Sequence, residues 1–241
     1  MYRADSIKTK ILVTKQDNMQ RINLSVTWIQ NGVFSRYSDA EMSNEGGLFV
    51  IRSKQDYFYY LEADRLGMKQ FKRKRPRFLI DIQWQYTRVL RKVEYISNCK
   101  KGFFWKLILL LYKFRLNRLS IKSSLSIPPN VFGPGLTLFH HGTIVVNPSA
   151  RVGSDCQLYC CTNIADGVKI GDKVFIAPGV KVLNNVTIAD GVRIGANSVV
   201  TKSILEPNIT IAGAPARKIS DKGTAEHYQG GTERIENGLQ M

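Results

Sequence analysis

A six-residue repeat runs through the C-terminal half of this 241-residue chain and restricts its fold more than any other feature. Large aliphatic residues occupy every sixth position without exception: Val146, Val152, Leu158, Ile164, Ile170, Ile176, Val182, Ile188, Ile194 and Val200. A second series of small or β-branched residues, from Ala150 to Ser198, follows four positions behind the first. Such regularity indicates one structural unit repeated many times.

A period of six fits neither the 3.6-residue turn of an α-helix nor the simple alternation of a hairpin. Short parallel strands joined by sharp corners satisfy it, because each strand then points its aliphatic residue inward and stacks on the coil below at about 4.8 Å. Corner residues such as Asn184 and Asn185 tolerate the positive φ that tight turns need. The repeat therefore predicts a mainly β fold built as a parallel β-helix.

The preceding region, residues 53–123, has helical patterns instead. Ser53 with Asp56 three positions later is typical of a helix start. Residues 81–98 place one apolar face on a second helix, formed by Ile82, Tyr86, Val89, Leu90 and Val93. Residues 103–121 are apolar around most of a third helix before becoming basic, which predicts a helical bundle or a subunit contact, with a membrane-lying helix as the alternative.

The net charge of +16 is concentrated in this helical region. Residues 65–122 contain 17 Lys or Arg against Asp81 and Glu94, a net charge of +15. Repulsion within residues 69–77, KQFKRKRPR, predicts a solvated basic face. Association with an acidic polysaccharide or, peripherally, with an anionic membrane stays open. Nucleic acid is not expected as a partner, because no recognised binding motif accompanies the charge.

Several classes of protein are excluded by what the sequence lacks. The first residues show no apolar stretch typical of an export signal, and the strongest apolar run, Leu107 to Tyr112, is far shorter than the roughly 20 residues that span a bilayer. We therefore expect a cytoplasmic protein. The four cysteines show neither a disulfide framework nor metal-ligand spacing, and we interpret them as reduced thiols in the core. Residues 1–52 are poorly patterned, Met42 is an alternative start, and residues 221–241 are expected to form a polar tail.

The repeats, together with SVVTKSILEPNITIAGAPARKI at residues 198–219, resemble the hexapeptide-repeat acyltransferases. The resemblance implies a left-handed parallel β-helix over residues 124–220, with three hexapeptides per coil and therefore roughly three coils. It also implies acetyl-CoA as co-substrate, no metal, and a homotrimer with active sites between neighbouring subunits.

The segments GPGLTLFHHGTIVVN, YLEADRLG and RVLRKVEYISN are similar to the serine acetyltransferase branch of that family, including relatives found among capsule and surface-polysaccharide genes. This similarity places His140 on the catalytic histidine. An imidazole with an ordinary pKa near 6.5 suits proton removal from a hydroxyl at neutral pH. His141 should point the other way if this stretch is extended, toward the outside or a subunit contact. No role is assigned to His227.

Further residues are implied as coenzyme A contacts by the same resemblance. Ala196, Thr201, Lys202, Gly213 and Ala214 would line the groove, and Arg217 or Lys218 would meet a phosphate.

Two departures from the branch bear on function. Serine acetyltransferases carry an aspartate 15 residues before the histidine, where this chain has Leu125, so Asp81, another N-terminal acid or a backbone carbonyl would have to hold the ring. They also interrupt the coils with a loop bearing an Arg-His pair that grips the amino acid, whereas residues 160–175 continue without His or Arg.

We therefore expect O-acetylation of a sugar or surface polysaccharide. Serine O-acetylation is the first alternative, and a non-catalytic trimeric anion-binding scaffold is the second. The related γ-type carbonic anhydrases are excluded because His140, His141 and His227 cannot supply three separated metal ligands.

Overall fold

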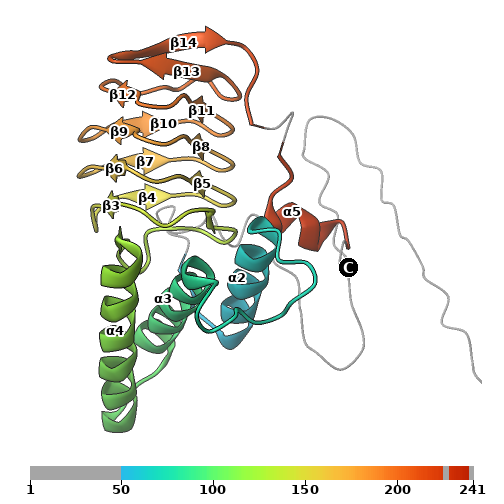
Figure 1. Ribbon diagram of the computed structural model, residues 1–241, viewed down its shortest axis with the longest axis vertical. Coiled ribbons are helices and arrows are strands. Elements are labelled where there is room, and N and C mark those ends of the chain that lie inside the picture. Colours follow the sequence, from blue (N-terminus) through green and yellow to red (C-terminus); the bar gives the residue numbers. More distant parts are fainter. Residues whose placement is uncertain (1–49, 225–227, 239–241) are drawn as a thin grey trace, which may run out of the picture. The chain divides into compact units, whose positions relative to one another are not determined.

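The computed structural model describes residues 50–224 and 228–238, and Figure 1 shows helices at one end of a stack of β-coils. The poorly patterned segment 1–49, with the alternative start Met42, lies outside the described residues, and so does His227. The predicted class, a mainly β chain with a parallel β-helix preceded by helices, is confirmed.

Three helices precede the coils: α2 (Lys54–Gly67), α3 (Ile82–Cys99) and α4 (Phe103–Ser123). The predicted start of α2 is confirmed, because the backbone N–H of Asp56 donates to the Ser53 hydroxyl at 3.0 Å and the Asp56 carboxylate accepts from the Ser53 backbone at 3.0 Å. This reciprocal cap satisfies two backbone donors that a helix start leaves open. On α3, the predicted apolar face is buried apart from Ile82 at its first turn.

The strands are short and follow one another around the coils. They are β1 (Leu125–Ser126), β2 (Thr137–Leu138), β3 (Ile144–Val146), β4 (Arg151–Val152), β5 (Gln157–Leu158), β6 (Thr162–Ile164), β7 (Lys169–Ile170), β8 (Phe175–Ile176), β9 (Lys181–Val182), β10 (Thr187–Ile188), β11 (Arg193–Ile194), β12 (Val199–Val200), β13 (Thr210–Gly213) and β14 (Ala216–Ser220). They form three parallel sheets, in the orders β1-β3-β6-β9-β12, β4-β7-β10 and β2-β5-β8-β11-β13, with β14 added antiparallel to β13.

The coils number about five, and the expectation of roughly three was wrong. From the second coil onward the register is 18 residues, as in the pairs Arg151 with Lys169 and Gln157 with Phe175. The first coil pairs Leu138 with Leu158 instead, an offset of 20 residues. Counting hexads from Val146 therefore missed the first coil, whose repeat is out of phase with the rest.

The interior of the coils is the main hydrophobic core. All ten residues of the aliphatic series from Val146 to Val200 are buried, as the repeat predicts. Of the predicted corner residues, Asn185 has a positive φ of 59°, whereas Asn184 does not. Among the cysteines, Cys156 is buried in this core, but Cys161 is exposed, so the expectation of core thiols was wrong for Cys161.

A buried arginine joins the helices to the first coil. Arg91 on α3 donates to the carbonyl oxygens of Phe132 at 2.8 Å and Gly133 at 2.6 Å, and it pairs with Asp64 of α2 at 2.9 Å and with Glu94 at 3.1 Å. All three charged side chains are at most 2% exposed. Since buried charges are tolerated only when they are paired and hydrogen-bonded, this cluster requires the helices and the coil to be in place together.

The C-terminal segment, expected to be a polar tail, includes a short helix, α5 (Gly231–Glu236), that packs against α2. The buried carboxylate of Asp155 accepts from the backbone N–H of Thr232 at 3.1 Å and from the Thr232 hydroxyl. Burial raises the pKa of Asp155 to about 6, although the hydrogen bonds from Thr232 lower it. The attachment of α5 therefore includes a carboxyl group that titrates in an unusual range.

Stability at this junction should decrease as the pH rises. The folded state holds the Asp155 proton more tightly than the unfolded chain, where an aspartate has a pKa of about 3.9, so the contribution to the free energy of unfolding decreases between the two values. The difference corresponds to ~3 kcal/mol at 1.36 kcal/mol per pKa unit. In urea unfolding at about pH 4 and about pH 7, the wild type should lose this amount relative to Asp155→Asn. The exposed Asp221→Asn should follow the wild type, and a constant gap between wild type and Asp155→Asn would contradict the prediction.

Within the described residues, no helix is both long enough and apolar enough to cross a membrane.

Candidate active site

The two adjacent histidines lie in the corner between β2 and β3, where the first coil is longer than the others. Eight residues separate Leu138 from Val146, whereas six separate the equivalent Leu158 and Ile164 of the next coil. The corner therefore bulges by two residues. Gly142 closes the bulge with a φ of 139°, and a Cβ at this glycine would lie 2.7 Å from the Cβ of Cys160 in the coil above.

The imidazole of His140 is exposed at this bulge. Its ring lies against Tyr159 of the next coil, with 5.9 Å between centroids and 44° between planes. Tyr159 also contacts Phe139 at 5.5 Å and Phe175 at 5.3 Å, so the histidine adjoins a small aromatic cluster. Neither ring nitrogen of His140 makes a hydrogen bond or ion pair with the described part of the chain, which leaves both nitrogens open to a ligand.

The residues considered as partners for this ring are engaged elsewhere. Leu125, at the position of the expected aspartate, is 1% exposed and belongs to the core. The carboxylate of Asp81 accepts from Arg73 at 3.0 Å and from the backbone N–H of Arg77 at 2.8 Å. The suggestion that Asp81 orients His140 is therefore wrong: the two arginines of the basic loop hold this carboxylate instead.

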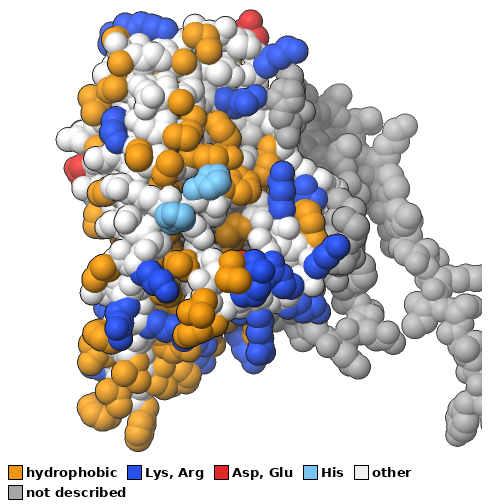
Figure 2. Space-filling view, in the orientation of Figure 1, with side chains coloured by type: hydrophobic (Ala, Val, Ile, Leu, Met, Phe, Trp, Pro, Cys, Tyr) orange, Lys and Arg blue, Asp and Glu red, His pale blue; other side chains and the backbone are white. Residues whose placement is uncertain are grey.

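His141 is also exposed, and Figure 2 shows the two histidine side chains, in pale blue, next to each other on one face among hydrophobic side chains. We expected His141 to point the other way if the segment was extended. The backbone bends at His140 instead of forming a strand, so this alternation does not apply. The nitrogen Nδ1 of His141 lies 3.5 Å from Nε2 of Gln83 at the start of α3.

The corner of His140 belongs to a continuous edge of the β-helix, which we call the histidine edge. It consists of the corners at residues 139–143, 159–161, 177–180, 195–198 and 212–215. Backbone hydrogen bonds join its successive levels, as from Gly179 to Cys160 and from Asn197 to Pro178. The side chain of Ser198 then accepts from the backbone N–H of Gly213 at 3.2 Å.

Three of the predicted coenzyme A residues, Ala196, Gly213 and Ala214, lie exposed on this edge. At about 4.8 Å per coil, Gly213 is four coils, roughly 19 Å, from the level of His140. The tertiary structure thus places the predicted base and these small residues along one edge, although more than 50 positions separate them in the sequence.

The other four predicted contacts are placed differently. Thr201 and Lys202 are exposed at the far end of β12, at the next edge of the coil. Arg217 is exposed on β14 and has no ion pair among the described residues. Lys218 is held by Glu206 at 2.5 Å and by Asp221 at 2.6 Å, so it is less available to a phosphate than Arg217.

Sequence reasoning missed Tyr159 and Gln83 as neighbours of the histidines. The contact of Tyr159 follows from stacking, because it stands one position after Leu158 and Leu158 pairs with Leu138. That signal could have been found only with the correct offset of the first coil. A hollow lined by Asn147, Asp166 and Asn184 lies at another edge and includes none of the predicted site residues. The described residues contain no cluster of three or more metal-ligating side chains.

Comparison with known proteins agrees with this geometry. Residues 167–202 match the family described as bacterial transferase hexapeptide (six repeats). The coils are therefore hexapeptide repeats of the bacterial transferase type. No curated protein matches the chain.

Solved structures of serine acetyltransferases share the fold. The enzyme from Brucella abortus strain S19 is 26% identical over 70% of each chain, with a TM-score of 0.55. The enzyme from Neisseria gonorrhoeae in complex with serine is 22% identical over 70% of this chain and 71% of the other, with a TM-score of 0.53. A serine acetyltransferase in complex with CoA is 21% identical over 69% and 71%, with a TM-score of 0.57.

Proposed function

We propose that this protein is an acetyl-CoA-dependent O-acetyltransferase with His140 as its general base. The observation that carries the proposal is the exposed imidazole of His140, with both nitrogens open, on the edge that also presents Ala196, Gly213 and Ala214. The hexapeptide repeat and the likeness to an acetyltransferase structure that contains CoA support the same class of reaction.

The reaction uses one proton transfer and one acyl transfer. A nitrogen of His140 removes the proton of the acceptor hydroxyl as its oxygen attacks the acetyl carbonyl of the thioester. The tetrahedral intermediate places a negative charge on the former carbonyl oxygen, which a backbone N–H at a coil corner would stabilise. The intermediate collapses by breaking the carbon–sulfur bond, and the thiolate of coenzyme A takes up the proton from His140.

Coenzyme A would extend along the histidine edge. Its pantetheine arm can pair with backbone amides of the corners, where the small side chains of Ala196 and Gly213 leave room. Arg217 is the better candidate for a phosphate contact, because Lys218 already pairs with two carboxylates. The remoter positions of Thr201 and Lys202 require the coenzyme to bend around the end of β12.

For the acceptor, we propose the hydroxyl of a sugar or of a surface or capsular polysaccharide. The supporting observation is the unbroken register of the coils, since the 18-residue pairing from β3 to β12 leaves no interrupting loop. A free amino acid needs a cation for its carboxylate, and an open edge without such a loop suits a bulkier substrate.

L-Serine is the second candidate acceptor, and the comparisons favour it. The similar solved structures are serine acetyltransferases, one of them in complex with serine, and the likeness covers about 70% of this chain. A cation for the carboxylate could come from a neighbouring subunit in the homotrimer that the family resemblance implies. A trimer would also enclose the histidine edge, and we include it in the proposal.

One assay separates these functions. The protein is incubated with acetyl-CoA and either L-serine or a panel of sugars and glycans, and the release of the coenzyme A thiol is followed. Release with sugars but not with serine is the expected result. Release with serine alone would replace the proposed acceptor by the second candidate. Absence of release with every acceptor would favour a non-catalytic scaffold.

A further inference from the structure

Helix α4 is apolar on two opposite faces, and only one of them is covered in the structure. The inner face packs against α3 and the first coil through Trp105, Ile108, Leu109, Tyr112, Leu116 and Leu119. The expected helical bundle therefore accounts for this face. It does not account for the remaining apolar residues of the helix.

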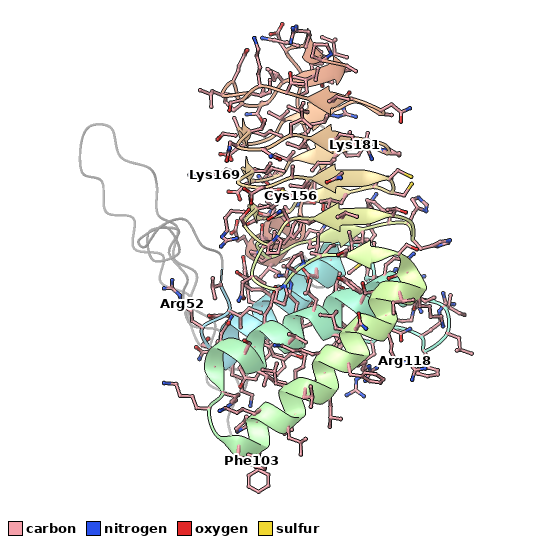
Figure 3. The ribbon with its side chains drawn as sticks, turned by 90° about the vertical axis from the view of Figure 1, so that its left-hand side faces the viewer. Arg52, Phe103, Arg118, Cys156, Lys169 and Lys181 are labelled. Carbon is pink, nitrogen blue, oxygen red and sulfur yellow. The ribbon has the colours of Figure 1, made fainter. Side chains whose placement is uncertain are left out.

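The opposite face presents seven large apolar side chains to solvent. They are Phe103, Phe104, Leu107, Leu110, Leu111, Phe114 and Ile121, with exposed fractions from 51% to 79%. Phe103, Leu107, Leu110 and Phe114 follow the spacing of three and four residues that places side chains on one helix face. Figure 3 shows Phe103 at the tip of α4, pointing away from the body of the protein. We call this set the outer stripe of α4.

Cations flank the outer stripe. Lys106, Lys113, Arg115, Arg118 and Lys122 are all exposed, and residues 103–123 contain no Asp or Glu. None of the five forms an ion pair with the described residues, and Arg118 instead lies over the ring of Phe114 at 5.7 Å. On the helix, Lys106 and Lys113 fall on one side of the stripe, and Arg115 and Lys122 on the other.

This combination selects among partners. A second copy of α4 would bring five unpaired cations against five more, with no acid on either helix to compensate, so self-association through this face is disfavoured. A purely polyanionic partner would pair the cations but leave the outer stripe in water. An anionic lipid bilayer satisfies both features, because apolar side chains enter the headgroup–acyl boundary while Lys and Arg meet the headgroups.

We propose that α4 lies flat on the surface of an anionic lipid bilayer, with the outer stripe inserted and the five flanking cations at the headgroups. The helix has 21 residues and is therefore about 30 Å long, and such a helix inserts its apolar face by roughly 5–10 Å. Neither His140 nor the predicted coenzyme A residues belong to α4, so the inference does not depend on the proposed acetyltransferase activity.

The test is sedimentation of the full-length protein with sucrose-loaded vesicles of phosphatidylcholine, with and without phosphatidylglycerol. We expect binding to the anionic vesicles, weaker binding at high salt, and little binding to the neutral ones. Leu107→Gln with Leu110→Gln should reduce the affinity at least tenfold. Lys113→Gln with Arg115→Gln should reduce it by about fivefold for each charge removed.

The matched control is Leu183→Gln with Leu205→Gln, because these leucines are similarly exposed but lie on the coils. This control should bind vesicles like the wild type. No binding to anionic vesicles, equal binding to neutral ones, or equal losses in both leucine pairs would overturn the proposal. Sedimentation velocity without lipid gives a further check, because a change of mass confined to the α4 variant would assign the outer stripe to a second copy instead.

Discussion

Replacing His140 by alanine is expected to lower kcat for acetyl transfer by about 10²–10⁴-fold, the usual contribution of a positioned general base. The acceptor hydroxyl would then have to lose its proton to water. The KM for acetyl-CoA should change little, because the predicted coenzyme contacts lie in other coils of the histidine edge. The measurement is the initial rate of thiol release with the acceptor that the panel identifies.

His141→Ala is the matched control for this substitution. The two residues are adjacent, exposed and of the same type, but His141 faces Gln83 instead of Tyr159. Its loss should change kcat by no more than a few-fold. Equal large losses in both variants would indicate that the bulged corner matters as a whole, and a loss confined to His141→Ala would assign the base to the wrong residue.

Replacing Arg91 by methionine is expected to lower the free energy of unfolding by about 3–5 kcal/mol, the cost of leaving buried charges without their partner. The change would strand the carboxylates of Asp64 and Glu94, together with two carbonyl oxygens of the first coil. The first coil and α2 would lose their shared contact. Urea unfolding followed by circular dichroism measures the effect.

Arg88→Met tests whether burial is the cause. Arg88 stands one turn earlier on α3 and is only partly buried, so its replacement should cost less than about 1 kcal/mol. Adding Asp64→Asn and Glu94→Gln to Arg91→Met should recover part of the loss, because the stranded charges are then removed. Similar losses for the two arginine variants would show that the buried cluster has no special weight.

The repeat was sufficient to predict the β-helix, because a hexad places one side chain per turn of the pattern in the interior and all ten members of the aliphatic series are buried there. It was not sufficient to count the coils. The first coil departs from the hexad at the very corner that contains the histidines, and an insertion of two residues cannot be distinguished from the end of a repeat until the pairing of Leu138 with Leu158 is known.

The candidate site shows the same division. His140 was identified from the residues around it, through their resemblance to a catalytic motif. Its surroundings could not be identified in that way, since the contact with Tyr159 crosses 19 positions and that of His141 with Gln83 crosses 58. Asp81 was a reasonable partner by residue type, but the local fold of the basic loop gives it to Arg73 and Arg77.

The sequence by itself determined the period of the coils, the positions of the helices and the concentration of positive charge, because each of these depends on residues close together in the chain. Only the tertiary structure decided which corners stack into the histidine edge, how Arg91 joins the helices to the first coil, and which face of α4 stays uncovered. Those features depend on contacts between distant residues, and a small change in coil length shifts every contact that follows it.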